Sequence, residues 1–251
     1  MNITATIITL NEEEHIAECI KSAKKVCNEI VVVDSNSSDN TVKIAESLGA
    51  KVVLQDFLGD GQQKDFCVQF ASNDWILSID ADERLGNDMI DDIKQLDLTN
   101  SQYDAYSFRR KSFIGDRWQK LWYPDNVIRL YNKNRCRYIH RMWHAYVDTK
   151  NVCRLNSHII HYSYKNLSHM AKTIDKYSYG SAKILYKKKK HVTCFTPVLR
   201  GMGAFLKKYI LKRGIFMGLD GLTISVFSGF NTYLKYAMLI EMYNEDKKQK
   251  K

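Results

Sequence analysis

The first 100 residues alternate short apolar runs with stretches that carry apolar side chains at helical spacing. The runs at 3–10, 29–34, 51–54 and 74–79 are rich in β-branched residues and predict strands buried on both faces. The segments at 16–23, 41–48 and 63–70 place apolar residues three and four positions apart and predict helices. This alternation indicates an α/β fold with a mostly parallel, doubly wound sheet.

The pattern changes after residue 100. Short β-like runs at 105–108, 127–131 and 158–162 predict further strands, and the chain reads as helical from Leu167 onward. We expect a packed or interfacial helix over 214–230, another helix over 233–243 and a frayed charged tail over 245–251. The sequence therefore predicts an α/β domain over 1–165 and a helical C-terminal region over 166–251.

One predicted helix, which starts near Val198 and is ended by Gly214, is amphipathic. Its apolar face is formed by Val198, Leu199, Met202, Phe205, Leu206, Tyr209 and Ile210, and its opposite face by Arg200, Lys207, Lys208 and Lys212. A basic amphipathic helix either lies on an anionic membrane surface or packs its apolar face into a core, and the pattern alone leaves both open. Each basic residue near anionic lipid contributes roughly 1 kcal/mol to binding.

Charge is divided unevenly along the 251 residues. Residues 1–100 hold 8 Lys and Arg against 19 Asp and Glu, whereas residues 101–251 hold 30 against 9. The net charge of +10 is therefore an average over an acidic half and a basic half, and it does not indicate a nucleic-acid partner. The six cysteines form no Cys-x-x-Cys pair, so we expect free thiols in a reducing compartment.

Targeting signals are not evident in the sequence. The start, Met1–Thr4, lacks a basic region followed by a small-residue cleavage site, and no run of about 18 purely apolar residues occurs. We expect a cytoplasmic protein, peripheral on the cytoplasmic face of the inner membrane.

Polar side chains follow three of the predicted strands. Thr9, Asn11 and Glu12 follow the first strand, Asp34 ends the second, and Asp80 and Asp82 follow the fourth. Ligands bind at the carboxyl ends of strands in such sheets. Two carboxylates two residues apart repel each other unless a cation lies between them, and oxygen ligands suit Mg²⁺ or Mn²⁺. Asp34 by itself is as well explained as a turn or cap residue.

Two common nucleotide sites are excluded by their missing motifs. The first strand is not followed by Gly-x-Gly-x-x-Gly, which argues against a dinucleotide-dependent dehydrogenase, and no Gly-x-x-x-x-Gly-Lys-Ser/Thr occurs. A nucleotide-sugar site with a metal-neutralised diphosphate remains as the common use of such a sheet edge.

Three ordered strings resemble a known family. They are Ile8–Glu13 (ITLNEE), Ile30–Thr41 (IVVVDSNSSDNT) and Trp75–Glu83 (WILSIDADE). Together they look like a family 2 glycosyltransferase of the GT-A fold. Further strings are similar to the lipopolysaccharide-core glucosyltransferase branch (WaaE/KdtX-like, LgtF-like), namely Gly61–Lys64, Trp122–Asp125, Arg129–Tyr131 and His161–Tyr164.

The resemblance implies roles for the matching positions. Residues 1–100 would bind the donor and 101–165 the acceptor. Thr9, Asn11 and Glu12 would line the nucleotide end, with Asp34 on the base or ribose. Asp80 would face the ribose, Lys64 would reach the nucleotide or diphosphate, and Asp82 would hold the metal on the diphosphate.

The general base is where the sequence departs from this branch. The branch carries His-Glu after the Arg-Leu-Phe segment, and this chain has Trp143–His144–Ala145, so the carboxylate is missing. His144, with an ordinary pKa of about 6.5, and Asp125, beside Pro124, are the candidate catalytic residues, and Asp148 is a third.

The resemblance implies an inverting, metal-assisted hexosyltransferase. Its donor would be a UDP-sugar, most simply UDP-glucose, and its acceptor a lipid-linked phosphorylated glycan of the lipooligosaccharide inner core. Two alternatives stay open on the sequence. One is transfer to a polyprenyl phosphate or another glycan, and the other is a non-catalytic basic module that binds membranes or polyanions.

Overall fold

The structure is a computed structural model that describes residues 2–142 and 145–249. It forms two compact units. The first comprises Met1–Ser112 and Tyr123–Ser163, and the second comprises Phe113–Trp122 and Tyr164–Lys251. The domain boundary at residue 165 that the sequence suggested stays a prediction, and the second unit also takes in residues 113–122 from the predicted α/β domain.

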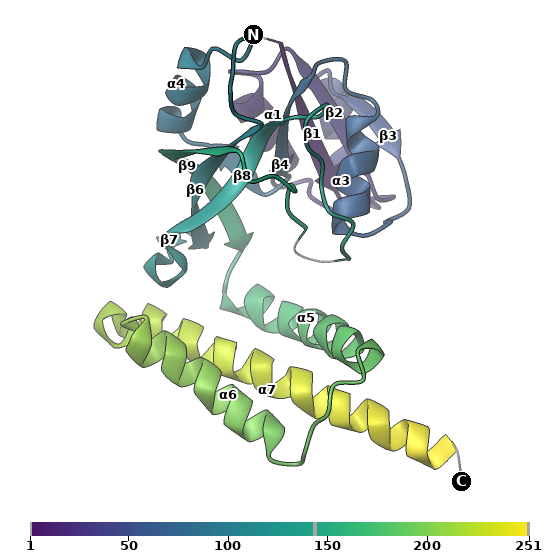
Figure 1. Cartoon of the computed structure of the whole chain (residues 1–251), viewed down its shortest axis with the longest axis vertical. Helices are drawn as coiled ribbons and strands as arrows, with labels where there is room; N and C mark the ends of the chain where they lie inside the picture. The colour runs from purple at the N-terminus through teal and green to yellow at the C-terminus, as the bar shows by residue number, and fades with distance from the viewer. Residues whose placement is uncertain (1, 143–144, 250–251) are drawn as a thin grey trace. The chain divides into compact units, whose positions relative to one another are not determined.

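In the described part of the chain, nine strands form one mixed sheet (Figure 1). The strands are β1 (Ile3–Thr9), β2 (Glu29–Asp34), β3 (Lys51–Leu54), β4 (Trp75–Asp80), β5 (Glu83–Leu85), β6 (Ala105–Ile114), β7 (Arg117–Trp118), β8 (Asp125–Asn132) and β9 (Val152–Tyr164). Their order is β3-β2-β1-β4-β8-β6-β9-β5, with β7 paired to β6.

Parallel pairs are formed among the first four strands. β1 runs parallel to β2 and β4, and β2 runs parallel to β3. β8 is antiparallel to both β4 and β6, and β5 is antiparallel to β9. The expectation of a mostly parallel sheet therefore holds for the N-terminal half only. The later strands also run longer than their apolar runs suggested, because β6 and β9 carry polar residues on an open face.

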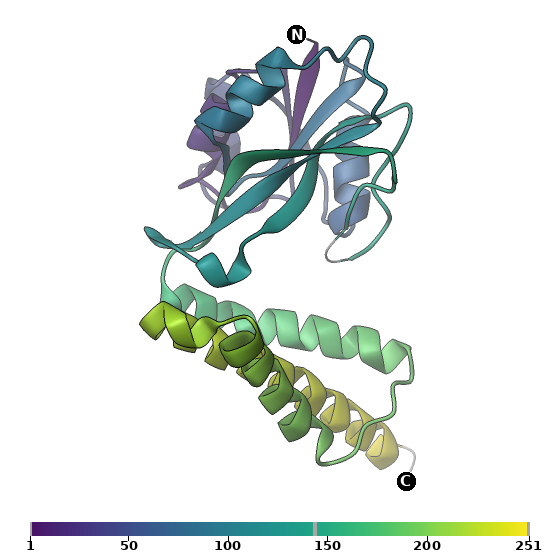
Figure 2. The same cartoon turned by 60° about the vertical axis from the view of Figure 1, so that its left-hand side comes forward.

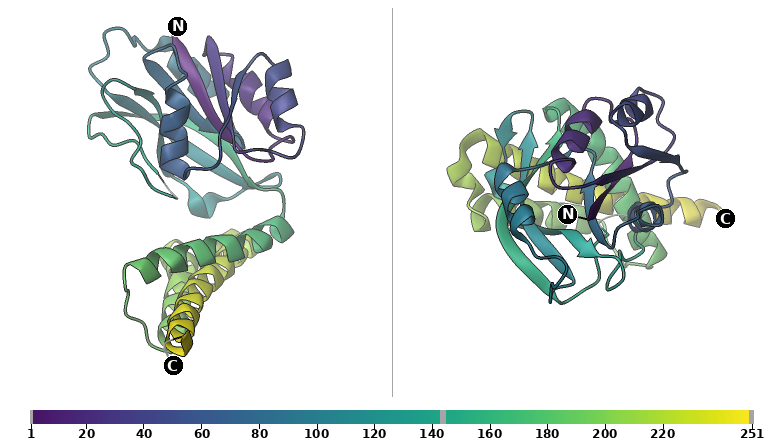
Figure 3. Two further views of the ribbon diagram at one scale, coloured as in Figure 1. Left: turned by 90° about the vertical axis from the view of Figure 1, so that its right-hand side faces the viewer. Right: turned by 90° about the horizontal axis from the view of Figure 1, so that it is seen from above.

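The helices of the first unit cover both faces of the sheet (Figure 3). They are α1 (Ile16–Ala23), α2 (Thr41–Ser47), α3 (Asp60–Val68) and α4 (Asn87–Gln95). Alternate residues of β2 point to opposite sides: Ile30 and Val32 lie in one core with α1, α2 and α4, whereas Val31 and Val33 pack on α3. This two-sided burial explains why β1, β2 and β4 are continuous apolar runs.

The register of the parallel strands fixes where the polar strand ends meet. Thr9 at the end of β1 lies opposite Asp34 at the end of β2. On the other side of β1, Ile8 lies opposite Asp80 at the end of β4. Three strands thus deliver their carboxyl ends to one edge of the sheet.

The second unit is helical (Figure 2). Its elements are α5 (Leu167–Lys187), α6 (Thr196–Leu206), a π turn η2 (Lys207–Leu211), a 3-10 turn η3 (Gly214–Met217) and α7 (Gly218–Gln249), with the short 3-10 turn η1 (Lys120–Trp122) in the hairpin segment. Ser178 of α5 donates a hydrogen bond of 2.6 Å to the side chain of Asn231 in α7. α7 is one helix as far as Gln249, so the expectations of a separate helix over 233–243 and of a frayed tail from 245 were wrong.

The last turns of α7 have partners in α5 and in the segment that follows it. The Tyr186 hydroxyl donates a hydrogen bond to Asp246, and the Tyr243 hydroxyl donates to the carbonyl of Lys190. In the part of the chain that the structure describes, no helix has the length and apolar content that crossing a bilayer requires. All six cysteines are free, as expected.

Candidate active site

The loops that follow β1 and β2 are locked together by Asp34. This buried carboxylate accepts hydrogen bonds from the Thr9 hydroxyl at 2.6 Å, from the Ser37 amide at 2.7 Å and from the Ser37 hydroxyl at 2.6 Å. The Asn11 amide donates to Ser37 Oγ, and Asn11 Oδ1 accepts from the Ser38 amide. The structure therefore brings Thr9, Asn11 and Asp34 close together. Asp34 is buried beneath the loop residues Asn11 and Ser37. Its contact with a nucleotide stays a prediction.

Glu12 lies at the start of the turn that leads into α1. Its amide donates to Thr41 Oγ1 at 2.8 Å, and its carbonyl accepts from the amides of His15 and Ile16. The backbone of Glu12 thus ties the end of β1 to the beginning of α2, beside the Asp34 loop.

Asp80 ends β4 between two cations. Lys64 Nζ of α3 lies 3.0 Å from Asp80 Oδ1, and Arg129 Nη2 of β8 lies 2.9 Å from Asp80 Oδ2. Burial raises the pKa of Asp80, but the charges of Lys64 and Arg129 outweigh it and hold that pKa well below its usual range. Asp80 is therefore a permanent anion, and Lys64, which the sequence placed at the diphosphate, is held against it.

A row of alternating charges extends from Asp80 in both directions. On one side Lys64 also lies 3.0 Å from Asp60 Oδ1, in the first turn of α3. On the other side Arg129 lies 2.6 Å from Glu83 Oε1, which is 3.6 Å from Arg110. Arg110 in turn donates two hydrogen bonds to Asp125. The row thus has the order Asp60, Lys64, Asp80, Arg129, Glu83, Arg110 and Asp125.

The charges of the row interact strongly because most of its side chains are buried. Glu83 is buried, and Lys64 and Arg129 expose 5% and 6% of their surfaces. Burial lowers the pKa of both cations, but the neighbouring carboxylates raise it by more. For Lys64 the largest such effect on the pKa comes from Asp80, and for Arg129 it comes from Glu83 and then Asp80. Four carboxylates face three cations along the row, so its formal charge is negative.

Asp82 lies two residues beyond Asp80 and faces a different partner. His161 Nε2 of β9 lies 3.2 Å from Asp82 Oδ2, and both side chains are partly exposed. His161 Nδ1 lies within hydrogen-bond distance of the hydroxyls of Ser112 and Ser163, which fix the ring. Burial lowers the pKa of His161, but the hydrogen bond and the charge of Asp82 raise it above its ordinary value.

The Asp82 and His161 pair has the chemistry of a partial site for a divalent cation. A carboxylate oxygen and an imidazole nitrogen are ligands that Mn²⁺ accepts, and the hydroxyls on Nδ1 supply the outer contacts that metal-bound histidines have. Among the described residues, no group of three or more His, Cys, Asp and Glu side chains is arranged to hold a metal alone. The pair therefore fits a cation that takes its remaining ligands from phosphate oxygens and water.

The candidate bases differ in what the structure shows of them. His144 lies outside the described residues. Asp125 is held by Arg110 at the far end of the charged row, and the Asp148 amide donates to the carbonyl of Arg137. The Ala145 amide donates a hydrogen bond of 2.8 Å to Asp60 Oδ2, so a carboxylate does lie beside residue 145.

The sequence does not single out Asp60 or Glu83 for this site. It makes Arg110 and Arg129 candidate ligands of acceptor phosphates, and the structure pairs both with carboxylates. Glu83, Arg129 and His161 stand in the strings that carried the resemblance, but their partners come from strands far along the chain. The structure explains why position 61, at the start of one of these strings, is a glycine. A Cβ there would lie 2.0 Å from the carbonyl oxygen of Ile139. Only glycine lets the start of α3, with Asp60 and Lys64, approach the segment that leads to residue 145.

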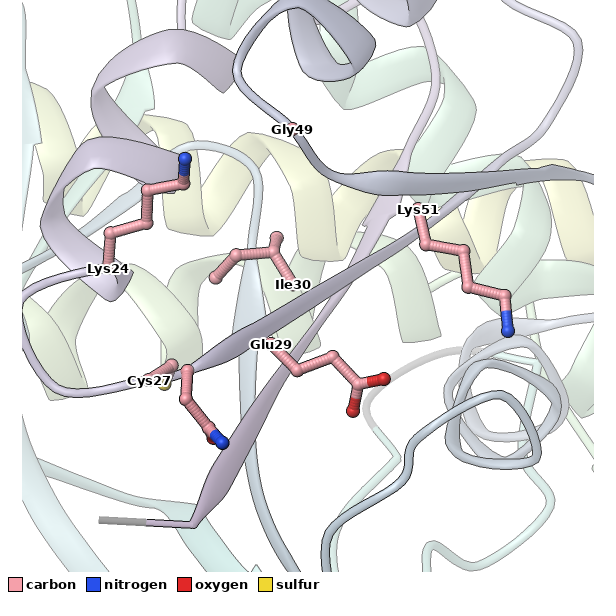
Figure 4. A pocket seen from close by; sticks show the side chains of 7 residues that line it. Lys24, Cys27, Glu29, Ile30, Gly49 and Lys51 are labelled. Atoms are coloured by element: carbon pink, nitrogen blue, oxygen red, sulfur yellow. The ribbon is translucent and has the colours of Figure 1, made fainter.

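A hollow of about 420 Å³ lies at the opposite edge of the sheet (Figure 4). It is lined by Lys24, Cys27, Glu29, Gly49 and Lys51, with β2 and β3 contributing their first residues. Burial raises the pKa of Glu29, but hydrogen bonds from Thr4 and Ser72 outweigh it and lower that pKa. This hollow contains none of the predicted site residues, so the strand carboxyl ends remain the candidate active site.

Comparison with known proteins identifies the family of the chain. A family model described as Glycosyl transferase family 2 matches residues 4–164, more than half of the chain. The chain belongs to glycosyl transferase family 2. Membership and sheet topology together establish a glycosyltransferase with the GT-A fold, as predicted.

Similar proteins cover different shares of the chain. An uncharacterized glycosyltransferase of Rickettsia typhi (strain ATCC VR-144 / Wilmington) is 35% identical over 254 residues, which cover 96% of this chain and 87% of the relative. Lipopolysaccharide core biosynthesis glycosyltransferase LpsC of Rhizobium meliloti (strain 1021) is 31% identical over 147 residues, 54% of this chain and 53% of LpsC. The solved structure of S. aureus TarS 1-349 aligns with a TM-score of 0.49 at 14% identity, covering 95% of this chain and 91% of TarS.

Proposed function

We propose that this family 2 glycosyltransferase moves a hexose, glucose from UDP-glucose, to the inner core of a lipooligosaccharide with inversion of the anomeric centre. The observation that carries the proposal is the Asp82 and His161 pair beside Asp80 at the end of β4. The similarity to LpsC, whose name states lipopolysaccharide core biosynthesis, supports the acceptor class. A lipid-linked acceptor places the enzyme on the cytoplasmic face of the inner membrane.

The charges of the site support a divalent cation, Mg²⁺ or Mn²⁺. Lys64 and Arg129 are already paired with carboxylates, and the row as a whole is negative. An incoming diphosphate brings further negative charge, so an added cation at Asp82 and His161 would balance it. When bound, such a cation stabilises the charge that develops on the UDP leaving group.

The residues of the chain have distinct tasks in this proposal. The loop that Asp34 orders, with Thr9, Asn11 and Glu12, receives the nucleotide. Asp80, fixed by Lys64 and Arg129, presents a permanently charged carboxylate to the ribose hydroxyls. Holding the donor in one orientation removes rotational freedom before the acceptor oxygen attacks the anomeric carbon.

The donor site is tested by calorimetry with UDP and Mn²⁺. Asp82→Asn removes the charged ligand, and we expect metal-dependent UDP binding to weaken by at least tenfold while the fold is retained. Asp91→Asn, which changes an exposed carboxylate of α4, is the matched control and should bind as the parent does. Unchanged metal-dependent binding by Asp82→Asn would show that the site assignment is wrong.

The base is tested by turnover in transfer assays. Asp60→Asn, Asp125→Asn, His144→Ala and Asp148→Asn are compared, and the variant that removes the base should lose about 10²–10⁴ in kcat with UDP affinity unchanged. Any residue whose variant keeps near-normal turnover is cleared of the role. Because Asn keeps the shape and hydrogen-bond acceptor of Asp, loss of the negative charge is isolated from loss of structure.

A further inference from the structure

The second unit exposes apolar side chains on both of its later helices. On α6 and the residues around it the exposed set is Phe195, Val198, Leu199, Met202, Leu206 and Ile210. On α7 it is Leu219, Leu222, Val226, Phe230 and Tyr233. Each set follows the three- and four-residue spacing of one helix face, so each helix presents an apolar stripe to its surroundings.

The turn that joins the two helices is the most exposed part of this surface. Leu211 exposes 78% of its surface, Phe216 83% and Leu219 71%. The backbone leaves α-helical geometry here, through η2, a left-handed Arg213 (φ 59°) and η3. Large apolar side chains are thus held outward at a compact turn, where a monomer in water gains nothing from them.

The charge around this surface is almost entirely positive. Residues 176–219 contain eleven Lys and Arg and no Asp or Glu, and the next residue, Asp220, is paired with Arg117 at 2.7 Å. Four of these cations, Lys207, Lys208, Lys212 and Arg213, lie in or next to η2, beside the exposed Leu211. A second copy of the chain docking on this face would bring like charges together, whereas an anionic lipid surface would neutralise them.

From this arrangement we infer that α6, η2, η3 and the start of α7 form a surface that docks on an anionic lipid bilayer. Leu211, Phe216 and Leu219 enter the boundary between headgroups and acyl chains, about 5–10 Å deep, while the cations contact the headgroups. The inference deepens the membrane location in the proposed function and rests on it. It extends the membrane-binding alternative that the sequence offered for the basic amphipathic helix and for the interfacial helix over 214–230 to the turn between them.

The experiment is flotation of the full chain with vesicles of phosphatidylcholine alone or with 30% phosphatidylglycerol. We expect flotation with the anionic vesicles at low salt and its decline as salt is raised. Leu211→Glu combined with Phe216→Glu should reduce the bound fraction at least tenfold. The matched control is Leu54→Glu, which changes an exposed leucine of β3 in the first unit and should float as the parent does.

Two results would overturn the inference. One is equal flotation of the Leu211→Glu/Phe216→Glu variant and the parent. The other is a parent that stays with the buffer and forms a dimer, by light scattering, that the same variant dissolves, since the surface would then bind a second copy. UDP and Mn²⁺ calorimetry on each variant reports the donor site separately, so loss of docking and failure of the proposed activity are distinguished.

Discussion

At the scale of single residues, the site is organised by side chains that hold one another in place. Arg129 is the centre of this arrangement, because it contacts both Asp80 and the buried Glu83. Its neighbours in the row are paired in turn, so every charge that the row buries has a partner of the opposite sign. A buried charge that loses its partner is destabilising by more than the pair was stabilising.

Arg129→Met is therefore expected to lower the free energy of unfolding by about 3 kcal/mol, since buried Glu83 keeps only the more distant Arg110, at 3.6 Å. Urea denaturation followed by circular dichroism measures the change. Adding Glu83→Gln to Arg129→Met removes the poorly paired buried charge and should restore a large part of the loss. If the double variant were no more stable than the single one, the loss would come from packing and not from charge.

At the scale of elements, sequence and structure agree where local pattern decides the outcome. β1, β2 and β4 were predictable because they are buried on both faces, and α1 because it shows one clear apolar side. The antiparallel strands, the length of α7 and the partners of Arg129 were not, because they depend on pairings between distant segments. His161 illustrates the limit: its residue type was visible, but its approach to Asp82 follows from β9 lying beside β5.

Two glycines of the helical unit make a matched test of how its elements pack. A Cβ on Gly221 of α7 would lie 2.0 Å from the carbonyl oxygen of Gly214, whereas a Cβ on Gly203 of α6 meets nothing within 4 Å. Gly221→Ala should therefore destabilise the chain by about 1–3 kcal/mol through forced displacement of η3. Gly203→Ala should stabilise it by up to about 1 kcal/mol, because alanine favours the helix.

Thermal denaturation of the two alanine variants and the parent provides the comparison. The midpoints should fall on opposite sides of the parent value. Equal shifts in one direction would mean that the contact between Gly214 and Gly221 does not limit packing there.

At the scale of the whole molecule, the division of the chain differs from its order in sequence. The hairpin of β7 and η1, residues 113–122, belongs to the same unit as α7. Arg117 forms an ion pair of 2.7 Å with Asp220, and Trp118, Leu121, Phe216 and Ile224 line a shared hollow of about 230 Å³. A polypeptide that stops at residue 165 would keep this hairpin and lose Phe216, Asp220 and Ile224, which pack beside it.

We expect a chain truncated after residue 165 to self-associate through the uncovered Trp118 and Leu121. Size-exclusion chromatography with light scattering measures this. The same truncation with Trp118→Ser and Leu121→Ser should be largely monomeric and should still bind UDP. Equal self-association of both truncated chains would show that the hairpin is not the surface through which they associate.

The shared strand β6 also sets how this enzyme can be recombined with its relatives. Its residues up to Ser112, which contacts His161, belong to the first unit, and its last two residues belong to the second. A chimera that joins the first unit of one relative to the helices of another with a single crossover near residue 165 would mismatch the hairpin and α7. Exchange of 113–122 together with 164–251, through three crossovers, keeps the contacts within each unit native.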